Sequence, residues 1–411
     1  LMLSSVNDQA VGAVGTANTY IGIFIIMFSV ISSGMVAVMT QNIGAGRPGV
    51  AYQARQLGLA FNAVLGIILS LILAFGAGTI LAGVGVADAL MQPARTYLQI
   101  VGGFCILNAL IPICSSYLRA FGFSKEPLYA SIIGNVINFC LNAFFLFVLH
   151  KGVAGVATAT VVSRIINLVI VVLLGAVLVK AKKHPERESN REVMGQIIRI
   201  GFPSACETAI YNVSMTLVIR FLNQMDAQGL NVTARSYTMQ ITNFSYCVGA
   251  ALAQANAIMT GWHIGAKEYD ACDRGTKKAA VIGVIVAVIL ETVFTLCFGW
   301  IMQLFSKDPQ MVSLVGKLLA IDIVLEIGRV TNLVYGQALK TSGDAVFPVV
   351  MGACFMILCS VGGTYLFGIR LGLLAVGAYI GMAGDECVRA IGMYLRWKSG
   401  KWKQKGLVKS R

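Results

Sequence analysis

The sequence has few charged residues and even fewer acidic ones. Of its 411 residues only 12% are charged, with 18 Asp and Glu against 32 Lys and Arg. A soluble globular domain carries about 25% charged residues, so this composition excludes that class. Instead, 57% of the residues are hydrophobic, the mean hydropathy is +0.77, and apolar runs of about 20 residues recur along the chain. The chain is therefore predicted to be a polytopic membrane protein.

Motifs for catalysis, metal binding and disulfide formation are also lacking. Three histidines lie far apart, nine of the ten cysteines fall inside apolar spans, and the chain has no CxxC, HExxH, GxSxG or P-loop pattern. We therefore expect no enzyme activity and no cofactor beyond a coupling ion. The net charge of +14 is explained by basic cytoplasmic loops and predicts no nucleic-acid partner, only the lipid bilayer and a small-molecule substrate.

The apolar runs predict an all-α fold, and the loops predict its orientation. Of the 32 Lys and Arg, 22 fall in one alternate set of loops and in the C-terminal tail, whereas five fall in the other set. Because basic loops stay inside, the C-terminus is predicted to be cytoplasmic, in the plasma (inner) membrane. The eleven expected spans are residues 12–39, 55–82, 95–118, 127–149, 154–179, 197–222, 232–259, 277–304, 312–338, 346–368 and 372–396.

Two pairs of loop motifs indicate an internal duplication. The segment Thr40–Gly46 is similar to Gly261–Lys267, and Leu118–Gly122 is similar to Leu339–Gly343, each at an offset of 221 residues. A constant offset over two separate motifs is typical of duplicated transporter halves. We interpret five spans followed by six as a six-plus-six arrangement of parallel repeats whose first helix is absent.

Ionisable residues within the spans are the candidate functional groups. Asp322, Glu326 and Arg329 stand at i, i+4 and i+7 and share one helical stripe. Glu207 lies in another apolar run. Such groups cost about 2.5–3.5 kcal/mol each on insertion scales, so they usually face a cavity and carry function. We expect ion or substrate binding here, including a possible Na⁺ site at Glu207, Asp322 and Glu326, with Arg329 holding Glu326 ionised.

Other polar residues within the spans have weaker assignments. Asn135, Asn138 and Asn142 form one polar stripe, which either hydrogen-bonds a neighbouring helix or lines a cavity. We interpret Asp385, Glu386 and Arg389 as an ion-paired trio on a helix surface, and Glu291 has no local partner. Four more residues are cavity-lining candidates: Tyr211, Asn212, Asn332 and Tyr335.

These motifs together resemble the multidrug and toxic compound extrusion (MATE) family of transporters. The resemblance rests on Gln41–Gly46 and Ile264–Lys267, on Arg199–Pro203 followed by Glu207, and on the paired loops that precede Pro127 and Pro348. It covers essentially the whole chain. It implies two six-helix bundles, alternating access, and acidic cation-site residues in the helices that hold Glu207 and the Asp322/Glu326 pair.

The resemblance also sets expectations for organisation and function. The expected parts are an N-terminal bundle at 1–180, a basic linker at 181–198, a C-terminal bundle at 199–396 and a basic tail at 397–411. We expect a monomeric secondary-active exporter of amphiphilic cations that exchanges them for Na⁺ or H⁺. The alternative is a lipid-linked oligosaccharide flippase of the same superfamily, whose cavity would be lined by many cationic residues.

Overall fold

Nearly all of the chain is helical in a computed structural model that describes residues 8–83, 86, 88–179, 186–226, 229–303, 306 and 308–408, without the side chains of 8–10, 88 and 89. Within these ranges there is no β-strand. Part of the expected linker, residues 181–185, lies outside the described residues, and residues 190–198 of it are helical. The predicted all-α fold is confirmed.

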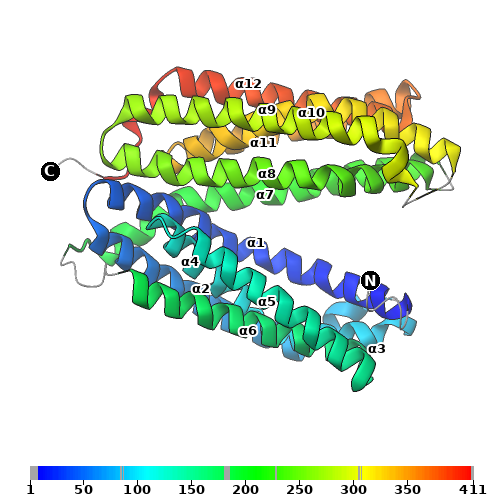
Figure 1. The fold of residues 1–411 in the computed structure, drawn as a ribbon, viewed down its shortest axis with the longest axis horizontal. Helices are drawn as coiled ribbons and strands as arrows, with labels where there is room; N and C mark the ends of the chain where they lie inside the picture. The colour runs from blue at the N-terminus through cyan, green and yellow to red at the C-terminus, as the bar shows by residue number, and fades with distance from the viewer. Residues whose placement is uncertain are drawn as a thin grey trace. The chain divides into compact units, whose positions relative to one another are not determined.

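Eleven helical segments follow one another in the described residues (Figure 1). The first five are α1 (Asp8–Gly44), α2 (Pro48–Gly83), α3 with η1 and α4 (Asp88–Tyr97, Leu98–Gly102, Ile106–Ala120), α5 with η2 (Lys125–Ala143, Phe144–Val148) and α6 (Gly152–Leu178). The other six are α7 (Asn190–Met225), α8 (Leu230–Gly265), α9 (Tyr269–Met302), α10 (Pro309–Thr341), α11 with η4 and η5 (Val346–Phe355, Met356–Val361, Thr364–Arg370) and α12 (Leu374–Lys398).

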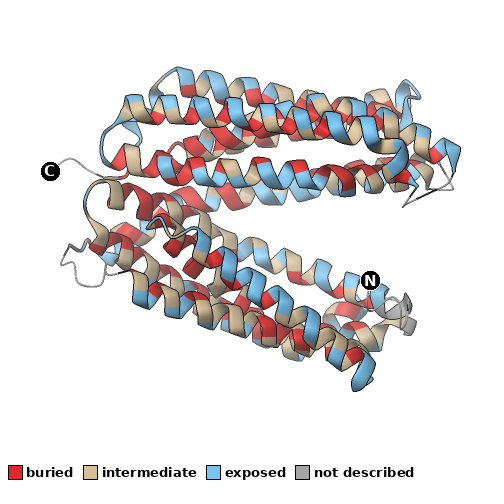
Figure 2. Cartoon of the chain, viewed as in Figure 1, coloured by how far each residue is buried: buried red, intermediate tan, exposed pale blue. Residues whose placement is uncertain are grey.

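The segments group into two compact units, which meet in the sequence inside α7. The first unit holds the residues up to Ile43 and Arg47–Phe202, and the second holds Gly44–Gly46 and Pro203–Arg411. In both units the helices have faces of exposed residues (Figure 2). Large apolar side chains such as Phe75, Leu296 and Trp300 are among the exposed residues. An apolar exterior is the pattern expected of helices that face lipid.

Polarity separates the helices into two kinds. By length and composition, six helices among the described residues could cross a membrane, or seven if α3 and α4, which are bent by 43°, form one span. Four long helices that lie wholly or partly in the second unit, α7, α8, α10 and α12, do not pass that apolar test. These four helices also carry most of the buried charged side chains of the second unit.

The duplication inferred from the loops extends to the helices. Moving α1 and α2 forward by 221 residues brings them onto α8 and α9 within a few residues, and α6 likewise falls on α12. The turns repeat as well. Gly122 and Gly343 both have positive φ, 89° and 98°, and each donates its N–H to a carbonyl three residues earlier, at 3.0 Å. Both halves are therefore built on one backbone plan.

In the second unit α10 is the central helix, and it packs against α8, α9 and α12. Val330 on α10 is fully buried and lies against Gly249 of α8 and Gly283 of α9, where an added Cβ would come within 2.8 and 2.7 Å of its methyl groups. On another side, a Cβ at Gly328 would lie 2.7 Å from the backbone nitrogen of Cys387 on α12. Small residues thus let α10 approach its neighbours closely, as is common in membrane bundles.

The chain folds back after α12. A short 3₁₀ turn, η6 (Lys401–Gln404), places the Trp402 ring 4.1 Å from the Trp397 ring in a stacked pair, and both side chains are buried. The Trp402 indole N–H donates to the carbonyl of Trp397, and the Trp397 indole N–H donates to Asp273 on α9, each at 2.9 Å. The start of the expected basic tail is therefore part of the second unit's core.

Candidate functional site

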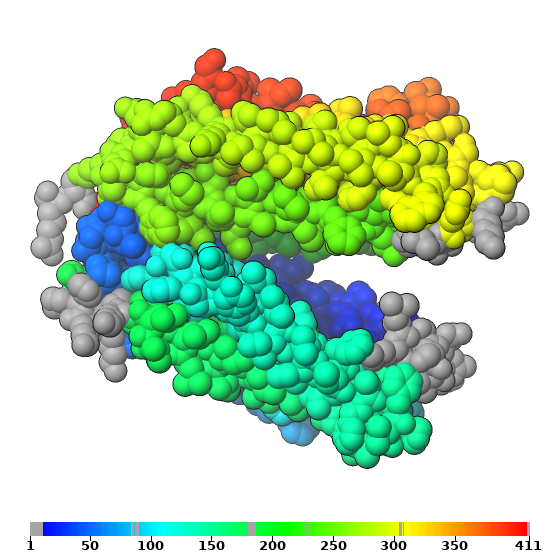
Figure 3. All heavy atoms as spheres, viewed as in Figure 1, coloured from blue at the N-terminus to red at the C-terminus, as the bar shows by residue number. Residues whose placement is uncertain are grey.

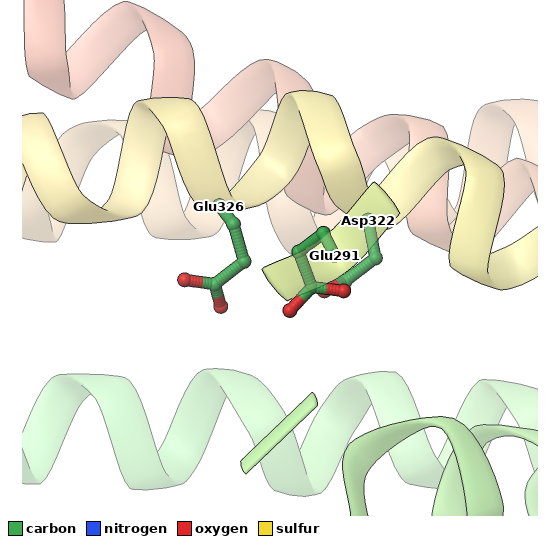
Figure 4. Close-up of side chains that lie close together, drawn as sticks. All are labelled: Glu291, Asp322 and Glu326. Atoms are coloured by element: carbon green, nitrogen blue, oxygen red, sulfur yellow. The ribbon is translucent and has the colours of Figure 1, made fainter. Parts of the chain in front are cut away.

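Three buried carboxylates come together inside the second unit (Figure 4). Glu291 comes from α9, and Asp322 and Glu326 come from successive turns of α10. One oxygen of each lies within 4.8 Å of the other two, and the exposed fractions are 0%, 2% and 0% respectively. The space-filling view shows α8 and α9 forming the visible face of this unit, coloured yellow-green to yellow (Figure 3). We call Glu291, Asp322 and Glu326 the carboxylate cluster.

The carboxylate cluster has only one basic partner among the described residues. Arg329, one turn along α10, forms an ion pair with Glu326. Both oxygens of Glu291 and one oxygen each of Asp322 and Glu326 are buried without a hydrogen-bond partner in the described part of the chain. Three carboxylates against one guanidinium leave excess negative charge in a low-dielectric interior, which a bound cation or protons must compensate.

The donor set fits a hard cation. Three carboxylate oxygens, one from each residue, converge from two helices, and oxygen ligands are those that alkali and alkaline-earth cations prefer. The Ser245 hydroxyl on α8 faces Glu291 and is buried without a hydrogen bond of normal geometry. Ser245 would supply a further neutral oxygen. The same carboxylates could instead hold protons.

A network of ion pairs lies beside the carboxylate cluster. Arg389 contacts Asp385 and Glu386, each at 2.8 Å, and Arg329 lies 3.8 Å from Glu386. The amide of Asn332 donates to Glu386 at 3.0 Å. The prediction that Asp385, Glu386 and Arg389 form a helix-surface trio is wrong in location, because all three are more than 90% buried. The pairing within the trio is as expected, but it faces the interior of the unit.

Two cavities that share part of their lining lie beside this network of ion pairs. One has a volume of about 210 Å³ and is lined by residues of α7, α8, α10, η4 and α12. The second, about 250 Å³, lies among α7, α8, α10, η4 and α12. Tyr211, Tyr246, Arg329 and Glu386 line both cavities. Asp322 links the carboxylate cluster to the first cavity, because it belongs to both.

Glu207 stands apart from the carboxylate cluster. Its carboxylate forms an ion pair with Lys340 of α10, at 2.6 Å, and lines the second cavity. The expected grouping of Glu207 with Asp322 and Glu326 is therefore replaced by Glu291 with Asp322 and Glu326. The physical reason is that Lys340, about three turns beyond Arg329 on α10, provides Glu207 with its own counter-charge.

Of the four predicted cavity-lining residues of the second unit, two line a cavity and two do not. Tyr211 and Asn332 line the cavities, whereas Asn212 is exposed. Tyr335 packs against the rings of Tyr394 and Trp397 in an apolar cluster instead of lining either cavity.

The asparagine stripe belongs to the first unit. Asn142 donates to Asn138 at 2.9 Å, and Asn138 donates to Ser163 of α6 at 3.3 Å, while Asn135 is exposed. Of the three, Asn138 therefore makes an interhelical hydrogen bond, whereas the bond between Asn142 and Asn138 stays within α5.

Sequence reasoning missed Glu291 and Arg235 as site residues. A signal existed for each, since neither has an opposite charge at i±3 or i±4, and Glu291 also lies in an apolar run. Neither residue could be assigned a partner from the sequence, because the residues around them come from other helices.

Comparisons with known proteins agree with this fold. A family model named MatE matches residues 1–144 and 203–366. YisQ of Bacillus subtilis, an uncharacterized transporter, is 33% identical over 99% of this chain and 90% of its own length. NorM of Thermotoga maritima, a probable multidrug resistance protein, is 22% identical over 97% of this chain and 87% of its own length.

A solved structure also matches the fold of this chain. A crystal structure of MATE in the bent conformation matches with a TM-score of 0.88 at 18% identity, covering 98% of this chain and 90% of that chain. The likeness shows a shared fold. The resemblance inferred from the loop motifs is confirmed by the family match and by the extent of identity to YisQ. The chain therefore belongs to the MatE family of multi-pass membrane transporters.

Proposed function

We propose that this transporter exports amphiphilic cations by secondary-active exchange, and that the carboxylate cluster binds the driving ion, Na⁺ or H⁺. The observation that carries the proposal is the uncompensated negative charge of Glu291, Asp322 and Glu326 directly beside a cavity. Relatives described as probable multidrug resistance proteins support the cargo class. Buried ionisable groups in a membrane span are otherwise costly and therefore point to a transport role.

The first cavity suits an amphiphilic substrate. Tyr211 and Tyr246 supply aromatic faces, and Met215, Met239 and Met382 supply flexible apolar surface. Aromatic rings bind cations through their π faces, and methionine adapts to ligands of different shape. Asp322 adds a carboxylate with one unpartnered oxygen. A cavity of this kind favours organic cations without selecting one shape.

Exchange follows if ion and cargo compete for the same negative charge. A driving ion bound by the carboxylate cluster neutralises Asp322, which removes much of the attraction for a cationic substrate in the cavity. Ion and cargo therefore weaken each other's binding, and this coupling is reciprocal. Ion entry would then release cargo, and ion exit would restore the cargo site during alternating access.

The proposal extends to the location and state of the protein. We place the transporter in the plasma membrane with a cytoplasmic C-terminus, because the loops rich in Lys and Arg lie on that side. We propose that it works as a monomer, since one chain holds the carboxylate cluster and both cavities.

The lipid-linked oligosaccharide flippase remains the less favoured function. Such a protein is expected to line its cavity with cationic residues. Here the acids and bases that line the two cavities balance, with Glu207, Asp322, Asp385 and Glu386 against Arg235, Arg329, Lys340 and Arg389. Because of this balance the cavities have no excess of positive charge with which to bind a large anionic pyrophosphate.

A liposome assay tests the exchange. Purified protein is reconstituted, a Na⁺ gradient or a pH gradient is imposed separately, and efflux of a cationic xanthylium dye is followed by fluorescence. We expect one of the two gradients to drive efflux, and Glu291→Gln to abolish the gradient-driven part, because it removes a charge from the carboxylate cluster.

Asp270→Asn is the matched control, since Asp270 stands in the exposed first turn of the same helix, α9. It should leave efflux unchanged. If Glu291→Gln retained full gradient-driven efflux, or if neither gradient drove efflux in the unmodified chain, the proposed coupling would be wrong.

A further inference from the structure

One buried base of the second unit has no acidic partner. Arg235 on α8 is 7% exposed and lines the first cavity. Its Nε atom is buried without a hydrogen-bond partner among the described residues, and one of its terminal nitrogens donates to the sulfur of Met215, at 3.8 Å. No carboxylate lies within ion-pair distance of it in the described part of the chain. By contrast, Arg329, Lys340 and Arg389 each have a carboxylate partner.

An unpaired guanidinium in this place needs an explanation. Burying a charge without a partner is strongly unfavourable, and breaking a buried ion pair costs about 3–5 kcal/mol. Thioether sulfur is a weak acceptor that satisfies little of this demand. Arginine presents five N–H donors in a planar fork that matches a carboxylate or phosphate. The guanidinium of Arg235 therefore has free N–H donors that an acidic group in the cavity would satisfy.

Arg235 lies apart from Arg329 along the wall of the first cavity. Arg235 and Tyr246 both line the first cavity and stand eleven residues apart on α8, which is about 16 Å along the helix axis. Tyr246 is at the level of Arg329, whose guanidinium carbon lies 5.9 Å from its ring centre. One cavity thus offers a free cation near the start of α8 and, elsewhere on its wall, the free carboxylate oxygen of Asp322.

We propose that Arg235 binds an acidic group of the exported molecule, so that the cargo class is amphoteric: an amphiphile with both a cationic and an anionic group. This proposal rests on the proposed export function and narrows its substrate. The cationic end is attracted by Asp322 and the aromatic rings, and the acidic end forms charge-assisted hydrogen bonds with the Arg235 fork. Such a molecule compensates both free charges of the cavity at once.

A matched pair of ligands tests the assignment. One probe is the methyl ester of a cationic xanthylium dye, which carries only the positive charge. The other probe is the free acid of the same dye, in which a carboxylate replaces the ester. Equilibrium binding is measured by fluorescence polarisation on the full chain in nanodiscs of zwitterionic lipid, without any ion gradient. We expect the unmodified chain to bind the free acid more tightly. Arg235→Gln should weaken free-acid binding by about tenfold and ester binding by less than about twofold, because a hydrogen bond to a charged group is worth at least that factor.

Arg235→Lys is the matched control variant. It keeps the charge but loses the planar fork, so it should retain part of the preference for the free acid. Gel filtration and thermal unfolding establish that the variants are folded. If Arg235→Gln did not fold, the ester and free acid on the unmodified chain would still decide the matter, because equal or tighter binding of the ester overturns the proposal.

Two further outcomes contradict the assignment. Equal weakening of both dyes by Arg235→Gln would make Arg235 a structural residue. Loss of the free-acid preference in nanodiscs of anionic phospholipid would mean that the headgroup of an anionic lipid occupies the fork. Failure of gradient-driven efflux in liposomes, with free-acid binding intact, would instead contradict the export mechanism and leave the binding assignment standing.

Discussion

The two halves of the chain share a backbone plan and differ in where they put charge. Glu291, Asp322 and Glu326 correspond, at the offset of 221 residues, to Ser70, Val101 and Cys105 of the first unit. Arg329 corresponds to Asn108. The second unit therefore holds a carboxylate cluster and a guanidinium where the first holds small or weakly polar side chains. Duplication kept the helices and turns, and a handful of side-chain differences confined the cluster to one half.

Backbone shape differs at the same place. In the first unit, the span that corresponds to α10 is broken between η1 and α4 and bent by 43°, and the Ser70 hydroxyl accepts the N–H of Ile106 at 3.1 Å. In the second unit α10 is one continuous helix of 33 residues. A continuous helix satisfies its own backbone, so the side chain at the Ser70-equivalent position, Glu291, is free to face other side chains. The carboxylate cluster of the second unit therefore depends on a continuous α10.

The largest expected difference concerns Arg329. Arg329→Met removes the one basic partner that Glu326 has among the described residues, and one partner of Glu386. Breaking a buried ion pair costs about 3–5 kcal/mol, so the unfolding midpoint in detergent should fall markedly. Asn108→Ala at the equivalent position of the first unit removes no ion pair and should cost less than about 1 kcal/mol. Equal losses for the two variants would mean that the charge network does not distinguish the units energetically.

A smaller effect is expected where α10 approaches α12. In Gly328→Ala the new methyl group would meet the backbone of Glu386 and Cys387 at 2.8 and 2.7 Å. Overpacking of this kind costs about 1–3 kcal/mol, and it should also reduce efflux because it displaces Glu386. Gly384→Ala, on α12, meets nothing within 4 Å and should be neutral or slightly stabilising. Thermal unfolding and efflux are measured for both, and an unchanged Gly328→Ala would show that the close packing can relax.

The smallest expected difference is between the two repeated turns, because alanine at either glycine meets the same backbone strain. Gly122→Ala and Gly343→Ala both force alanine to a positive φ, which costs about 1–2 kcal/mol. At Gly343 the added Cβ would also lie 2.3 Å from the carbonyl oxygen of Lys405, whereas at Gly122 it meets nothing within 4 Å. Gly343→Ala should therefore lower the unfolding midpoint more than Gly122→Ala. The reverse order would mean that the tail contributes little to the second unit.

Much of the fold could be predicted from the sequence because it depends on local signals. The apolar runs predict eleven helical segments, and the loop motifs predict the offset that the turns at Gly122 and Gly343 then display. The breaks inside the segments were not predicted. The bend between α3 and α4 depends on packing and on a hydrogen bond from Ile106 to Ser70, which lies on another helix.

The candidate site could be predicted only in part. The stripe of Asp322, Glu326 and Arg329 is a property of one helix, and its spacing indicates a shared face. Glu291 joins that face from α9, and Lys340 pairs with Glu207 across two helices. Such tertiary contacts leave no periodic pattern in a single sequence. Arg235 and the burial of Asp385 were missed for the same reason.

The stacked tryptophans at the end of α12 have a practical consequence. Because Trp402 is buried against Trp397 and Lys405 lies over Gly343, the domain continues past its last long helix. A purification tag or fluorescent fusion that replaced the residues after 398 would remove the packing of Trp402 and Lys405. One joined after residue 408 would keep that packing. Designs for expression and labelling should therefore keep the whole segment.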